Sequence, residues 1–94
     1  MTEPLGQFEG LEQDQRVRLS IYDSHIEIAV HDDPGGPAIK IPFDELGSVE
    51  VQEVLGMKAL VIEDTAGIVA ATVRMDQSDV DQAMRLVDNL QGRG

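Results

Sequence analysis

The hydrophobic pattern of this chain changes its period once, at Asp76. Upstream of Asp76, apolar residues recur at every second position in short runs separated by turn-forming residues, which is typical of β-strands. Downstream, they recur at the three- and four-residue spacing that places side chains on one face of an α-helix. The chain is therefore predicted to be mostly β, with one helix over about residues 77–91. The helical stripe consists of Val80, Ala83, Met84, Val87 and Leu90.

The clearest alternation lies in two neighbouring segments, 16–22 and 26–30, which flank the turn-forming pair Asp23-Ser24. The apolar residues occupy odd positions in the first segment and even positions in the second. A short connection between two paired strands can require such a switch of parity, so these segments are predicted to form an antiparallel hairpin. The alternating residues are Val17, Leu19 and Ile21, followed by Ile26, Ile28 and Val30.

Four further apolar runs follow and predict four more strands, at residues 39–43, 49–51, 59–62 and 68–75. Proline has no backbone donor, so Pro42 places the first of these strands at a sheet edge or at a strand end. The last two runs are apolar at both parities, which indicates central strands or strands covered on both faces. The intervening segments 32–37 and 54–57 are predicted to be a turn and a partly apolar loop.

The first 14 residues carry four acidic residues, two glycines and no Lys or Arg. Glycine weakens any regular pattern there, so residues 1–14 are predicted to be a loosely ordered acidic arm. We expect the arm to dock through Phe8 and Leu11 on a single domain that spans residues 15–94.

Short, strongly twisted strands tend to curl, and one amphipathic helix needs an apolar surface to cover. The fold class is therefore predicted to be α+β and mostly β. We expect an antiparallel, six- to seven-stranded bent sheet or partly open barrel, capped by the C-terminal helix.

The order of elements over residues 15–91 resembles the pleckstrin-homology-like superfamily, in particular its small bacterial-type domains. The resemblance rests on the strand meander, the closing helix and the stretch Ile39-Lys40-Ile41-Pro42-Phe43-Asp44-Glu45-Leu46-Gly47-Ser48-Val49. It implies seven strands, whereas the alternation predicts six. Either residues 5–12 supply the seventh strand or the barrel is incomplete.

Lipid and nucleic-acid partners are unexpected for this chain. Members of the resembled family that bind phosphoinositides use a basic cluster around the first hairpin loop, but the loop Tyr22-Asp23-Ser24-His25 contains no Lys or Arg. With 7 basic and 18 acidic residues, the formal net charge is −11. Anionic lipid surfaces and phosphate backbones both require a cationic face.

No motif in the chain indicates catalysis, a metal or a cofactor, so the protein is predicted not to be an enzyme. There is no cysteine. His25 and His31 are about 20 Å apart along an extended strand, too far to share one metal ion. The acidic pairs Asp44-Glu45 and Glu63-Asp64 occupy strand ends, where adjacent carboxylates normally face water. The chain also lacks a phosphate-binding loop and a nucleophile elbow.

The sequence therefore predicts a cytoplasmic, non-catalytic binding or assembly module that acts through protein–protein contacts and can form a homo-oligomer. Five residues are candidates for partner binding: the apolar Val54, Leu55 and Met57, and the same-parity cations Arg16 and Arg18. The alternative is an acidic inhibitor or immunity-type protein that captures a basic partner. That alternative requires the carboxylates to gather on one face.

Overall fold

The computed structural model describes residues 3–30, 36 and 38–91. The described chain forms seven β-strands, a single 3₁₀ turn and one α-helix. Their bounds are β1 (Gly6–Glu12), β2 (Gln15–Ile21), β3 (His25–Val30), β4 (Ala38–Pro42), η1 (Phe43–Glu45), β5 (Leu46–Val54), β6 (Met57–Asp64), β7 (Val69–Met75) and α1 (Gln77–Gln91).

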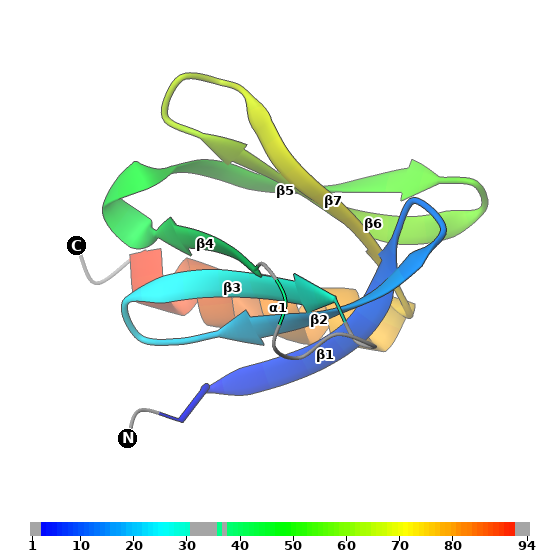
Figure 1. Cartoon of the computed structure of the whole chain (residues 1–94), viewed down its shortest axis with the longest axis horizontal. Helices are drawn as coiled ribbons and strands as arrows, with labels where there is room; N and C mark the ends of the chain where they lie inside the picture. The colour runs from blue at the N-terminus through cyan, green and yellow to red at the C-terminus, as the bar shows by residue number, and fades with distance from the viewer. Residues whose placement is uncertain (1–2, 31–35, 37, 92–94) are drawn as a thin grey trace.

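All seven strands belong to one antiparallel sheet in the order β4-β3-β2-β1-β7-β6-β5 (Figure 1). Each half of the sheet is a meander of sequence neighbours, and the halves meet where β1 pairs with β7 at Leu11 and Arg74. The sheet bends without closing, because β4 and β5 are its two unpaired ends. The predicted fold class is confirmed: a bent, seven-stranded antiparallel sheet with one C-terminal helix.

The predicted hairpin of residues 16–30 is also confirmed, since β2 pairs with β3 through Val17–Val30, Leu19–Ile28 and Ile21–Ile26. The strand that contains Pro42 lies at a sheet edge, as its missing backbone donor requires. The segment 59–62 lies in β6, between β5 and β7, and all four of its residues are buried.

The prediction of a loosely ordered arm at residues 1–14 is wrong over the segment that forms β1. This strand pairs with β2 along its whole length, and the ring of Phe8 is buried in the core. Gly6 and Gly10 occupy the same side of β1 as Phe8, so two of the three core-facing positions carry no side chain that could reveal a strand. Residues 6–12, within the segment 5–12 that the sequence offered for it, therefore supply the seventh strand.

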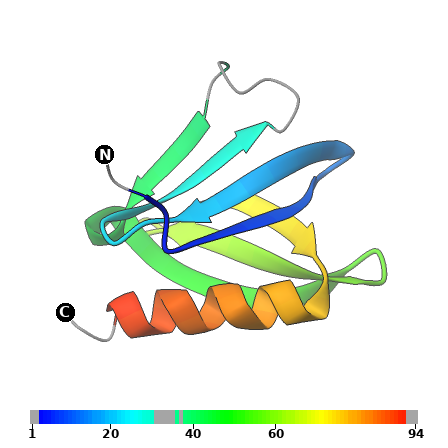
Figure 2. The same cartoon turned by 90° about the horizontal axis from the view of Figure 1, so that it is seen from below.

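Helix α1 has the bounds that the periodicity predicts. It buries Val80, Ala83 and Val87 against β6, β1, β2 and β5. Figure 2 shows the helix lying along one side of the bent sheet. Most of the predicted turn at residues 32–37, together with His31, lies outside the described residues.

Candidate functional site

The β5–β6 hairpin ends in a two-residue turn that consists of Leu55 and Gly56. Val54 and Met57 pair directly, so the predicted loop at 54–57 is in fact a tight hairpin connection. Both turn residues have a positive φ, 52° for Leu55 and 78° for Gly56. Such turns normally use Asn, Asp or Gly, because a positive φ places Cβ close to backbone atoms. Leucine at this position costs about 1–2 kcal/mol in backbone conformation.

The side chain of Leu55 is also almost fully exposed, at 82%. It is the most exposed large hydrophobic residue in the described part of the chain, ahead of Ile68 and Leu5. Leu55 therefore neither contributes to the core nor suits the turn.

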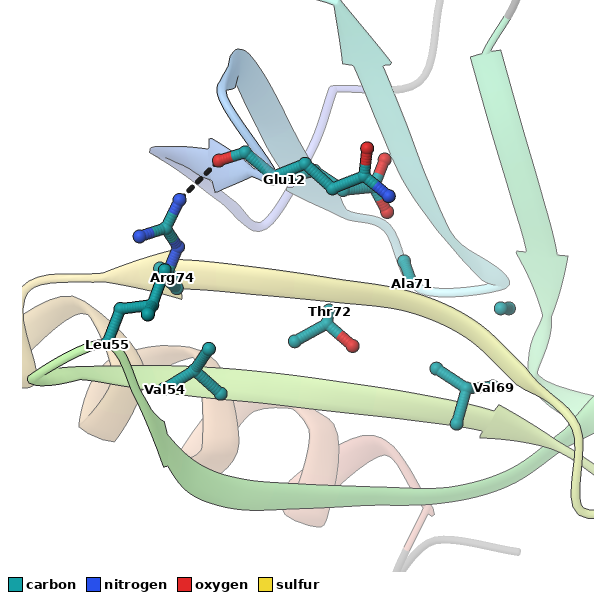
Figure 3. Close-up of a pocket in the computed structure, with 9 residues that line it drawn as sticks. Glu12, Val54, Leu55, Val69, Ala71, Thr72 and Arg74 are labelled. Atoms are coloured by element: carbon teal, nitrogen blue, oxygen red, sulfur yellow. Dashed lines mark hydrogen bonds between the residues drawn. The ribbon is translucent and has the colours of Figure 1, made fainter.

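A groove of about 470 Å³ begins beside Leu55. It runs along β7 from Leu55 and Arg74 at one end to Val69 at the other, with Thr72 between them (Figure 3). We call it the hairpin-tip groove. Five of its nine lining residues are apolar, and polar groups lie near the β1–β2 turn. The lining residues are Glu12, Gln13, Val54, Leu55, Val69, Ala70, Ala71, Thr72 and Arg74.

Arg74 fixes one end of this groove. Its guanidinium Nη2 donates a hydrogen bond to the backbone carbonyl of Gln13 in the β1–β2 turn (dashed line in Figure 3). This bond ties the first hairpin to β7 across 61 positions of the chain. Arg74 also lines an adjoining hollow of about 230 Å³, together with Arg16 and Met57. A guanidinium bound to a backbone carbonyl gives this end of the groove a fixed shape.

Four of the five predicted site residues therefore gather around Arg74. Val54 and Leu55 line the hairpin-tip groove, while Met57 and Arg16 line the adjoining hollow. Arg18 lies apart from them: its Nη2 is 3.5 Å from Oε1 of Glu9, and its side chain lines a different hollow on the β2–β3 surface.

Sequence reasoning missed Arg74 and the β1–β2 turn as parts of the site. The outward position of Arg74 in its strand was visible in the alternation with Val73 and Met75. Its proximity to the hairpin tip depends on the β6–β7 register, in which Ala59 pairs with Arg74. No local pattern in the sequence specifies that register.

The chemistry of the groove suits binding. Its lining offers one carboxylate and one guanidinium at the rim, and Thr72 carries its only side-chain hydroxyl. Across residues 3–30, 36 and 38–91, no three His, Cys, Asp or Glu side chains are placed to hold a metal ion. The same residues contain no helix that is both long and apolar enough to cross a membrane. An apolar groove with a polar rim can hold an apolar side chain and hydrogen-bond the backbone that carries it.

Comparison with known proteins adds no relative to this description. No protein-family model and no curated protein matches the chain.

The conformation of Leu55 leads to a prediction about stability. The Leu55→Asn variant is expected to raise the free energy of unfolding by about 0.5–1 kcal/mol, because Asn tolerates a positive φ and Asn-Gly favours this turn. The comparison is made by urea denaturation at a protein concentration low enough to exclude association. An unchanged or lower stability would show that the leucine is not under conformational strain.

Proposed function

We propose that this chain is a non-catalytic binding module of the pleckstrin-homology-like type that holds a protein partner at the hairpin-tip groove. The observation that carries the proposal is Leu55, which is 82% exposed at a positive φ. The seven strands and the closing helix support the resemblance, because both are features that it implies.

The energetics of Leu55 favour a bound state. Full burial of a leucine side chain contributes about 1.5–3 kcal/mol, which is similar to or larger than the conformational cost of about 1–2 kcal/mol in its backbone. Without a partner, the chain carries that cost and gains nothing from it. A partner that buries Leu55 and the apolar floor of the groove offsets the cost, and the polar rim can supply hydrogen bonds.

The distribution of acidic residues favours this proposal over capture of a basic partner. Described carboxylates lie on the β1–β2 hairpin, the β2–β3 hairpin, η1, β5, β6 and α1, so they are spread over many elements. A basic partner would be steered best by carboxylates gathered on one face. The groove itself carries one carboxylate, that of Glu12.

A capture experiment tests the proposal. The wild-type chain, Leu55→Asn and Leu5→Asn are immobilised separately and exposed to lysate from the native source. Leu5 is 53% exposed and lies outside the hairpin-tip groove, so its variant is a matched control. We expect one protein to bind the wild type and Leu5→Asn but not Leu55→Asn.

The retained protein is then purified and titrated against each variant. Leu55→Asn is expected to weaken binding by about 10- to 100-fold, which corresponds to the burial of one leucine. Binding that persists at about 0.5 M NaCl supports an apolar contact, whereas loss of binding supports the acidic-inhibitor alternative. If no protein, including this chain itself, binds in a Leu55-dependent manner, the proposed function is wrong.

A further inference from the structure

We propose that the occupant of the hairpin-tip groove is a second copy of this chain, in a two-fold dimer in which each Leu55 covers the groove of the other. The proposal rests on the proposed function, since it names the protein that the groove binds.

The first reason is that the surface is complementary to itself. Leu55 projects from one end of the groove, and the exposed Val69 lies at the other end (Figure 3). A two-fold interface uses the same patch on both subunits, so a projecting side chain and its receiving groove must lie on one surface. This chain has both. A two-fold axis near Thr72, in the middle of the groove, would place each leucine over the far end of the partner's groove, where Val69 and Ala70 lie.

The second reason is the local charge. Two copies that each carry −11 repel each other over most of their surfaces. In the hairpin-tip groove, however, the charges of Glu12 and Arg74 cancel. When the adjoining hollow is included, the surface carries two guanidinium groups, Arg16 and Arg74, and three carboxylates, Glu9, Glu12 and Asp76, so its net charge is −1. A second acidic copy therefore meets a nearly neutral surface here, with opposite charges available at the same rim.

Sedimentation equilibrium from about 10 µM to about 1 mM tests the dimer directly. We expect the wild type and the Leu5→Asn control to dimerise. Leu55→Asn is expected to weaken the dimer by about 100-fold or more, because two leucines are lost from each dimer. Added NaCl is expected to strengthen the wild-type dimer, since salt screens the repulsion between two acidic copies.

A complementation experiment tests the proposed geometry. Thr72→Lys places a long side chain in the groove but keeps Leu55, and it makes the chain less acidic, so added repulsion cannot explain a loss of dimer. Circular dichroism first verifies that both variants are folded. Neither variant is expected to dimerise alone. A mixture of Leu55→Asn and Thr72→Lys is expected to form a heterodimer, in which Leu55 of the Thr72→Lys copy covers the open groove of the Leu55→Asn copy. Because only one of the two contacts forms, this heterodimer is expected to be about tenfold weaker than the wild-type dimer.

Three results would overturn the dimer: a wild type that stays monomeric at about 1 mM, a Leu55→Asn variant that dimerises as the wild type does, or a mixture that stays monomeric. A monomeric wild type that captures a different protein through Leu55 would leave the proposed function intact. The failure of the dimer can thus be told apart from the failure of the binding module.

Discussion

Replacing Leu60 with alanine is expected to lower the free energy of unfolding by about 2–5 kcal/mol. Leu60 lies in β6, between two other strands, and is 1% exposed in the core. Its truncation removes apolar contacts and leaves a cavity that strands held on both sides cannot collapse to fill. The change is measured by urea denaturation, monitored by far-ultraviolet circular dichroism. If the unfolding free energy of the variant depends on urea concentration with the same slope as that of the wild type, both unfold in a two-state manner.

The matched control is Leu55→Ala, which makes the same chemical change at the exposed hairpin tip. It is expected to alter the stability of the monomer by less than about 0.5 kcal/mol, because the side chain contributes almost nothing to the core. Similar losses for the two variants would contradict the described placement of Leu55 outside the core.

Replacing Gly10 with alanine is expected to lower the free energy of unfolding by about 1–3 kcal/mol. A Cβ atom at Gly10 would lie 2.5 Å from the carbonyl oxygen of Arg74 and 2.7 Å from a side-chain carbon of Met75. The carbonyl belongs to the backbone of β7, so the contact is relieved only if β1 and β7 separate. That movement would also shift Arg74 relative to Gln13, and we expect it to weaken binding at the hairpin-tip groove.

Gly6→Ala is the control for that variant, in the same strand and on the same side. The Cβ atom there would meet the Cδ1 atom of Leu86 at 2.6 Å, which is the far end of a flexible side chain. Leu86 can change its rotamer to relieve this contact. Alanine also has less conformational entropy than glycine in the unfolded chain, so less entropy is lost on folding. We expect a change within about 1 kcal/mol. A larger loss at Gly6 than at Gly10 would show that the β1–β7 contact is not the tight one.

Strands whose core-facing positions are all apolar were predictable from the sequence alone. In β2 and β3, each core-facing position carries a large apolar side chain, so the period of two is visible in the residues themselves. In β1, the core-facing positions include Gly6 and Gly10, where neighbouring groups approach too closely for a side chain. The absence of side chains at Gly6 and Gly10 allows β1 to pack closely against its neighbours. It also removes the apolar residues from which hydrophobic periodicity would predict a strand.

The candidate site was predictable only in its local part. The apolar segment that contains Val54, Leu55 and Met57 stands out in the sequence because it falls between two strands. The positive φ of Leu55 and the neighbouring Arg74 depend on the turn length and on the β6–β7 register, which tertiary packing decides. Arg16 and Arg18 have the same parity, but their side chains line different hollows, and Arg18 pairs with Glu9 of β1.

The pairing of β1 with β7 also determines when this chain can complete its fold. Each half of the sheet is built from hairpins between sequence neighbours, which close quickly because their loops are short. The two halves are joined through the first strand and the last, so the sheet stays in two pieces until β7 has been synthesised. A ribosome that has made β1 to β6 therefore carries a chain with one edge of β1 still unpaired, and β7 is the strand that protects this edge from pairing with another chain.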